Sequence, residues 1–291
     1  MACSSKIPSK GDKKMKYANC HLHSTYSDGR LTPRQLVVIG KSLGYKALAL
    51  TDHETDGGYS ELCRHAEAEG GIETIPGIEF YGMFEGYHLH LTALDYDMDD
   101  PALRALVKRR CELRYECTKA RFQLAKGKGY VGDLTWDDVE KYAAPGSWFC
   151  PGSLVRAYEI LRIPEPENVI HNVFKTPEAA ALSTDVTPAD LVIKTVRGAG
   201  GIIALAHPVK WMHLVPALVD LGINGIEVSH PKLKDDLPDL TLEAAKKYNL
   251  YHAGGTDHDG AMSGLGGSHA YPTWNGITEE EFHILRSRAL G

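Results

Sequence analysis

Short apolar runs that end at a histidine or a carboxylate recur along this 291-residue chain, with helical patterns between them. We predict strands over residues 16–24, 47–53, 73–81, 87–95, 201–207, 222–229 and 250–257. We predict helices over residues 32–44, 57–70, 187–199, 211–221, 236–248 and 278–289. Alternating strands and helices with β-rich apolar runs are typical of a parallel sheet or a barrel. The sequence therefore predicts an α/β fold.

Residues 101–186 interrupt this alternation. The stretch PALRALVKRRCELRYECTKARFQLAKGKGY predicts one long amphipathic helix, and proline-rich turns follow it. Residues 101–130 hold nine Lys or Arg against two Glu, so these cations either face solvent or overhang an anionic ligand. We divide the chain into a disordered extension at 1–14, a barrel domain at 15–100 and 187–291, and an inserted helical subdomain at 101–186.

The composition excludes several classes of protein. The net charge of −6 argues against a binder of duplex nucleic acid, because such proteins need an excess of Lys and Arg. The six cysteines include no CxxC pair, so we expect free thiols in a reducing compartment and a cytoplasmic location. We expect no signal peptide and no membrane span, since no apolar segment is long enough for either. The sequence does not predict an oligomeric state.

The histidines and carboxylates fall where predicted strands end. His21 and His23 point the same way, because residues i and i+2 of a strand share a face. In a parallel barrel the carboxyl ends of all strands meet at one face, where active sites lie. The other candidates in or after predicted strands are His53, Glu79, His90, His207, His230 and Asp257.

Such a cluster predicts bound metal ions. Buried imidazoles and carboxylates would otherwise compete for few partners. A mixed His/Asp/Glu shell suits Zn, Mn or Fe and is too rich in nitrogen for Ca or Mg. The number of candidates exceeds the needs of one ion, so we expect two or three divalent ions. Closely spaced ions of this kind clamp a phosphoryl group and generate a hydroxide nucleophile.

The motifs HLHSTYSDG, TDH, GIE, HLT, AHP and GTD together resemble the PHP (polymerase and histidinol phosphatase) family of phosphoesterases. The likeness covers residues 16–97 and 199–262, which is most of the chain outside the helical insertion, and points to a small stand-alone member. The resemblance implies a distorted (βα)7 barrel with a centre of two or three metal ions, often Mn, Fe or Zn.

The resemblance also implies a ligand set. Carried over by position, the ligands are His21, His23, Glu79 and Asp257 for a first ion, Glu79, His90 and His207 for a second, and Asp28, His53 and Asp259 for a third. The family usually has histidine at the last of these places, in a D-x-H pattern. Here the residue is Asp259, with His258 before it, so His258 is the alternative ligand.

Further roles follow from the same resemblance. A basic residue soon after the AHP motif contacts phosphate in small members, and Lys210 fills that place. His230 follows the sixth strand, where it would hold phosphate or protonate the leaving oxygen. Asp52 is expected to orient a ligand rather than to bind metal. Small nucleotide phosphatases tend to carry an Arg- and His-rich stretch in the insertion. Here that stretch reads SWFCPGSLVRAYEI and has only Arg156 as an obvious cation, so the substrate pocket is expected to differ from theirs.

These expectations define an enzyme, a phosphoric ester hydrolase in which a metal-activated hydroxide attacks phosphorus. The preferred substrate is a small phosphorylated ribose, with a phosphoribosyl 1,2-cyclic phosphate diesterase that also removes the resulting monoester phosphate as the first choice. A nucleoside mono- or bisphosphate phosphatase, a histidinol-phosphate phosphatase and a catalytically silent metal- or phosphate-binding module remain alternatives. A single-metal deacylase would need fewer ligands.

Overall fold

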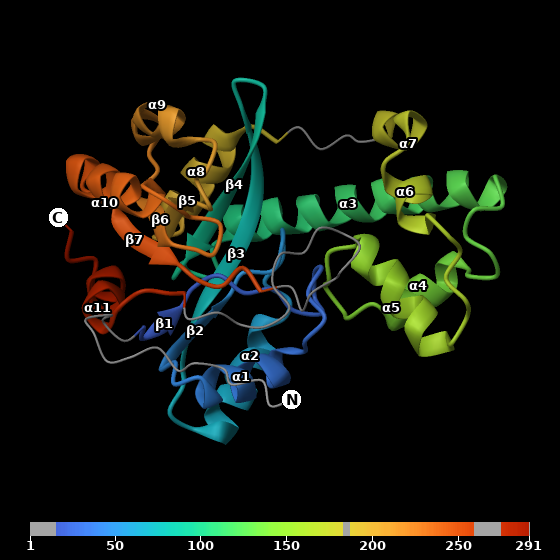
Figure 1. The fold of residues 1–291 in the computed structure, drawn as a ribbon, viewed down its shortest axis with the longest axis horizontal. Helices are drawn as coiled ribbons and strands as arrows, with labels where there is room; N and C mark the ends of the chain where they lie inside the picture. The colour runs from blue at the N-terminus through green and yellow to red at the C-terminus, as the bar shows by residue number, and fades with distance from the viewer. Residues whose placement is uncertain (1–15, 183–186, 259–274, 291) are drawn as a thin grey trace, which may run out of the picture.

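The computed structural model describes residues 16–182, 187–258 and 275–290. The predicted extension at 1–14 lies outside this range. Seven strands form one sheet in chain order: β1 Ala18–Asn19, β2 Ala47–Leu50, β3 Glu73–Phe84, β4 Tyr87–Leu94, β5 Ile202–Leu205, β6 Gly225–Ser229 and β7 Tyr251–Gly254. The Cys20 amide donates to the Gly254 carbonyl at 3.0 Å, and the Asp257 amide to the His21 carbonyl at 2.9 Å. These bonds join the first strand to the last, so the sheet is a nearly closed barrel (Figure 1).

The helices around the barrel match the predicted set. They are α1 Pro33–Ser42, α2 Tyr59–Glu69, α8 Ala189–Gly198, α9 Val215–Leu221, α10 Leu237–Tyr248 and α11 Glu279–Ser287. Thr32 and Gln35 form a reciprocal capping box at the start of α1, and Pro33 follows the cap. The helix predicted at 211–221 is divided into a 3-10 turn at Met212–Leu214 and α9, because Pro216 has no amide hydrogen to donate.

The expectation that all strands run parallel is wrong for β4. This strand pairs antiparallel with both β3 and β5, and Tyr81 lies opposite His90. A two-residue turn joins β3 to β4, with positive φ at Glu85 (48°) and Gly86 (81°), as such hairpin turns require. The reversal places His90 in the amino-terminal half of its strand, whereas His53 and His207 follow the carboxyl ends of theirs.

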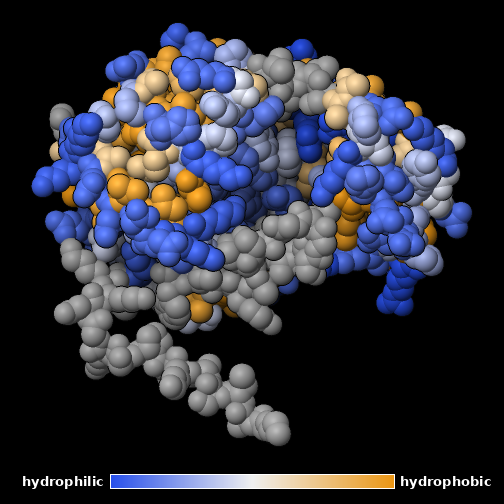
Figure 2. All heavy atoms as spheres, turned by 45° about the horizontal axis from the view of Figure 1, so that its top comes forward, coloured by the Kyte–Doolittle hydropathy of each residue, from blue (hydrophilic) through white to orange (hydrophobic). Residues whose placement is uncertain are grey.

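The helical region contains α3 Pro101–Gly127, α4 Trp136–Tyr142, α5 Pro151–Leu161, α6 Val169–Phe174 and α7 Pro177–Ala181. Its core is separate from the barrel core, and α3 contributes to both. Leu103 and Val107 pack with strands β3 to β6, whereas Phe122 and Ala125 pack with α4, α5 and α6. Figure 1 shows α3 running from the barrel to the far end of the helical region. Figure 2 shows a hollow between the two parts.

Two ion pairs fix α3 to the segment after β2. The buried Arg110 guanidinium donates to both carboxylate oxygens of Glu54, at 2.6 and 2.5 Å, and one of these oxygens also accepts the Tyr81 amide at 2.6 Å. Arg104 forms a second two-point contact with Asp56, at 3.0 and 2.5 Å. The start of the helical region is therefore held against the chain that carries His53.

Among the described residues, no helix combines the length and apolar character needed to cross a membrane.

Candidate metal centre

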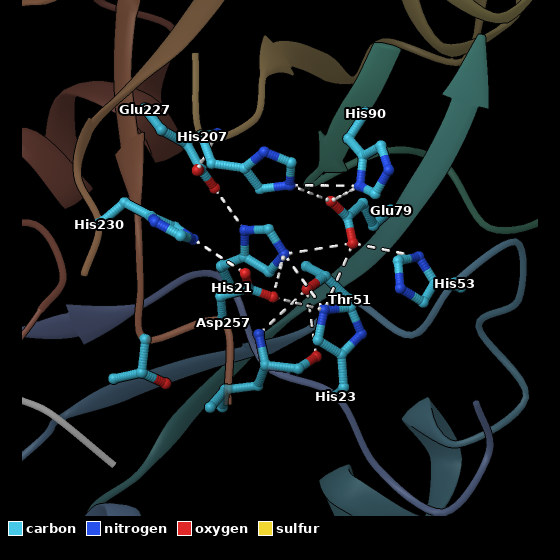
Figure 3. Close-up of polar contacts among 12 residues, drawn as sticks. His21, His23, Thr51, His53, Glu79, His90, His207, Glu227, His230 and Asp257 are labelled. Atoms are coloured by element: carbon cyan, nitrogen blue, oxygen red, sulfur yellow. Dashed lines mark hydrogen bonds and ion pairs between the residues drawn. The ribbon is translucent and has the colours of Figure 1, made fainter. Parts of the chain in front are cut away.

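Eight of the nine predicted metal ligands converge in one cluster, and Figure 3 labels all of these except Asp28. Asp259 lies outside the described residues. Imidazole rings from several strand ends face the carboxylates of Glu79 and Asp257. The ligand atoms that lie within 4.8 Å of one another form overlapping groups, among them one of His21, His23, Glu79 and Asp257 and one of His23, Asp28 and His53.

The first group consists of the four residues that we predicted for the first metal site. The Nε2 atoms of His21 and His23 lie 3.2 Å apart, and each lies 3.3 Å from Glu79 Oε2. Asp257 Oδ1 lies 3.5 Å from His21 Nε2 and 3.1 Å from His23 Nε2. The four side chains thus present two nitrogens and two oxygens to one point.

The second group shares Glu79 with the first. Glu79 Oε1 lies 2.8 Å from His90 Nδ1 and 3.1 Å from His207 Nε2. The two ring nitrogens are themselves 3.2 Å apart. Glu79 therefore directs one oxygen at each group, as a bridging ligand would.

The third group includes Asp28 and His53. Asp28 Oδ2 lies 3.5 Å from His53 Nε2, and Asp28 Oδ1 lies 3.7 Å from His23 Nδ1. His258 is buried, and its carbonyl accepts the His23 amide at 3.0 Å. Whether His258 or Asp259 completes this group stays a prediction.

The cluster fits divalent cations. Glu79 Oε2 is buried and accepts no hydrogen bond from the described residues, although ring nitrogens of His21, His23 and His53 lie within 3.3 Å. Burial by itself favours a protonated Glu79, but the surrounding imidazoles outweigh it and hold the pKa of that carboxyl well below its usual range. An ionised carboxylate among several imidazoles is a donor set for Mn, Fe or Zn.

Glu227 is a site residue that our sequence analysis missed. Its Oε1 lies 2.5 Å from His21 Nδ1, and its Oε2 accepts the His207 amide at 2.6 Å. A proton on Nδ1 leaves the His21 Nε2 lone pair facing Glu79 and Asp257, so Glu227 orients a ligand. Burial acts to raise the pKa of Glu227, but the charge and hydrogen bond of His21 outweigh it and lower the pKa. An acidic residue inside the apolar run GIEVS was the available signal.

Asp52 holds a turn rather than a histidine ring. Its carboxylate accepts the Ser24 amide and the Ser24 hydroxyl, both at 2.7 Å, and the Ser27 hydroxyl at 2.5 Å. Arg156 supports the same turn by donating to the carbonyls of Thr25 and Gly29. Because Asp28 lies on this turn, Asp52 and Arg156 position it from two sides.

The two residues predicted to contact substrate lie in different settings. His230 is buried, and its Nε2 lies 3.1 Å from Asp257 Oδ2. Its Nδ1 accepts the Lys232 amide at 3.0 Å, so its ring proton is on Nε2. Lys210 is exposed in the loop after β5. Its phosphate contact stays a prediction.

Aromatic side chains border the cluster on the side of the helical region. The Trp148 ring lies 5.1 Å from the His53 ring and 5.8 Å from the Tyr81 ring. The Arg114 guanidinium lies 4.2 Å from the centre of the Trp148 ring, in a cation–π contact. We term these three residues, Tyr81, Arg114 and Trp148, the aromatic wall.

Comparison with known proteins agrees with this geometry. Residues 19–137 match the PHP domain. The chain is 28% identical over 255 residues to a 5'-3' exoribonuclease of Haemophilus influenzae, covering 81% of this chain and 88% of the relative. It is 28% identical over 248 residues to the phosphoribosyl 1,2-cyclic phosphate 1,2-diphosphodiesterase of Eggerthella lenta, covering 82% and 93%.

A solved structure shares the fold. It belongs to a Bifidobacterium adolescentis protein described as a metal-dependent phosphoesterase, with a TM-score of 0.74 at 23% identity over 94% of this chain and 96% of that one. The match lies in the barrel and in the attached helices alike, since it covers nearly the whole of both chains. Residues 19–137 therefore carry the PHP domain, and over most of its length the chain is similar to phosphoesterases.

Proposed function

We propose that this metal-dependent phosphoesterase acts on a small phosphorylated ribose, and that phosphoribosyl 1,2-cyclic phosphate is its best substrate. The observation that carries the proposal is the sharing of Glu79 between two groups of ligands, because it builds adjacent metal sites around one carboxylate. Opening a cyclic phosphate leaves the new monoester phosphate beside the same groups. One centre then serves both hydrolytic steps.

The residues of the site would have separate roles in metal binding and in contact with the substrate. His21, His23, Glu79 and Asp257 would hold one divalent ion, Glu79, His90 and His207 a second, and Asp28 with His53 would contribute to a third. Such ions activate water and neutralise charge on the phosphoryl oxygens. The Nε2 proton of His230 bonds Asp257 Oδ2 in the free protein, and it would have to leave that oxygen to donate to a phosphoryl or leaving oxygen.

The aromatic wall supports a substrate with a sugar or base next to the scissile phosphate. The Trp148 ring is buried beside His53, with Arg114 stacked on it. An aromatic ring next to a guanidinium suits a ribose or base that carries a second anionic group. The ribose phosphate named for the Eggerthella lenta relative has this composition.

A second candidate is hydrolysis at the 5' end of single-stranded RNA. The Haemophilus influenzae relative is named for this activity, and aromatic rings beside a cation are the usual platform for single-stranded nucleic acid. In this case the aromatic wall would stack the first or second base. Our predicted restriction to small substrates would then be too narrow.

The test is phosphate release by Mn-loaded protein from a panel of substrates. The panel contains phosphoribosyl 1,2-cyclic phosphate, nucleoside mono- and bisphosphates, histidinol phosphate and a short 5'-phosphorylated RNA. Fastest turnover of the cyclic compound supports the proposal, and fastest turnover of another member replaces it. An Asp257→Asn variant is the control for contaminating phosphatase. Metal binding without any hydrolysis would leave the silent binding module as the explanation.

A further inference from the structure

Asp257 directs its two carboxylate oxygens at different partners. Oδ1 faces the ligand nitrogens of His21 and His23, at 3.5 and 3.1 Å. Oδ2 lies 3.1 Å from His230 Nε2 and 2.6 Å from Lys232 Nζ. Oδ1 of Asp257 therefore faces the metal cluster, and Oδ2 accepts hydrogen bonds from the His230 imidazole and the Lys232 ammonium.

Lys232 lies at the accessible side of the cluster. Its side chain is 42% exposed, whereas the side chains of Asp257 and His230 are 12% and 0% exposed. The Lys232 amide bonds His230 Nδ1, so the same short turn sets both the ammonium and the imidazole. A molecule that reaches the cluster from solvent meets this ammonium beside the buried ligands.

The Lys232 ammonium can bind an anion without leaving Asp257 Oδ2 unpaired. A lysine has three donors, so it can bond Asp257 and an anionic oxygen at the same time. If it moves further toward the anion, Asp257 Oδ2 keeps its bond to His230.

We propose that Lys232 is a substrate-binding residue whose ammonium donates to a non-bridging oxygen of the phosphoryl group being hydrolysed, with Asp257 as the residue that positions it. This inference rests on the proposed function. It places the phosphate-binding cation in the turn after β6, whereas the sequence pattern places it at Lys210 after β5. A compact ammonium on a flexible stem is well suited to follow a phosphoryl group.

A purely structural role is the competing explanation. Lys232 would then only balance the charge of Asp257, and its loss would weaken metal binding rather than phosphate binding. The two roles separate in a measurement of binding that does not depend on turnover. Inorganic phosphate binding to Mn-loaded protein reports the first role, and Mn²⁺ binding alone reports the second.

The experiment compares Lys232→Gln, Lys232→Arg, Lys210→Gln and the exposed neighbour Lys234→Gln as the matched control. Each is titrated with Mn²⁺ and then, Mn-loaded, with inorganic phosphate, and kcat and KM are measured on the best substrate. We expect Lys232→Gln to weaken phosphate binding and raise KM by about 10- to 100-fold, the usual effect of a lost charge-assisted hydrogen bond. Mn²⁺ affinity should change less than about threefold, and Lys232→Arg should recover part of the phosphate affinity.

Two results would overturn the inference. One is a loss of Mn²⁺ affinity in Lys232→Gln with phosphate affinity unchanged. The other is a loss of phosphate affinity in Lys210→Gln but not in Lys232→Gln. Failure of the proposed function would be distinguishable from failure of this inference. If the protein hydrolyses no phosphate ester, the phosphate titration still shows whether Lys232 binds phosphate.

Discussion

His21 Nδ1 and Glu227 Oε1 lie 2.5 Å apart, and both side chains are fully buried. The contact joins the chain after β1 to the middle of β6. It orients a ring whose other nitrogen faces Glu79 and Asp257. Partners of this kind tune metal affinity without touching the metal.

Glu227→Gln should weaken metal binding. The amide keeps the size of the side chain but removes the charge that holds the His21 ring, so Mn²⁺ affinity is expected to fall by about 10- to 100-fold. Isothermal titration with Mn²⁺ measures the change. Glu243→Gln, on the exposed face of α10, is the matched control and should bind as the wild type does. Equal affinities in both variants would show that Glu227 does not tune the site.

Metal content should distinguish the ligand groups. Asp28→Asn removes a charge from the third group only, so we expect a loss of about one ion per chain, with the other sites filled. His21→Ala affects the group around Asp257 and should abolish hydrolysis. Elemental analysis of purified, Mn-dialysed variants gives the counts. If Asp28→Asn binds as many ions as the wild type, the third group holds none.

The buried pair of Arg110 and Glu54 should couple the helical region to the barrel. Arg110→Leu leaves Glu54 buried without its cation, at a cost of about 3–5 kcal/mol in the free energy of unfolding. Replacing both residues by leucine removes the unpaired charge and should recover part of that loss. Denaturant unfolding of the two single variants and the double variant completes the cycle. Additive losses would mean that the pair contributes no coupling.

The cap of α11 should be sensitive to acid. Burial acts to raise the pKa of Glu281, but hydrogen bonds from His252 and from the Thr278 amide and hydroxyl outweigh it and lower the pKa to about 2. A carboxyl with a depressed folded-state pKa stabilises the protein above its unfolded-state pKa. Its contribution is therefore full above pH 4.5 and declines as the pH falls from 4.5 toward 2.

Glu281→Gln should therefore cost about 1–2 kcal/mol at pH 7 and much less near pH 3. The free energy of unfolding at both pH values provides the measurement. Glu279→Gln is the control, because its ion pair with His283 is exposed and contributes little. An equal deficit of Glu281→Gln at both pH values would contradict the assignment.

Local sequence signals predicted the elements but not the direction of one strand. Thr32 and Pro33 predicted the start of α1, and apolar runs located all seven strands. The strand at 73–81 was predicted three residues too short. The gap before residue 87 therefore hid the two-residue turn at Glu85 and Gly86, which can join only antiparallel strands.

The convergence of eight candidate ligands could be predicted because residue type and strand position together place them in one cluster. The partners of Glu227 and Lys232 could not be predicted, since each partner comes from a different strand. Glu227 is 206 residues from His21 along the chain, and Lys232 is 25 residues from Asp257. Neither spacing forms a recognisable sequence pattern. Closure of the barrel brings Glu227 to His21, and the pairing of β6 with β7 brings Lys232 to Asp257.

Helix α3 behaves as a rod clamped at one end. Its 27 residues span about 40 Å, and the contacts of Leu103, Arg104, Val107 and Arg110 hold the first third against the barrel. Bending of such a rod moves the free end most and the clamped part least. Arg114 lies just beyond the clamp, so bending of the helix displaces its guanidinium on the Trp148 ring less than it displaces residues near Gly127.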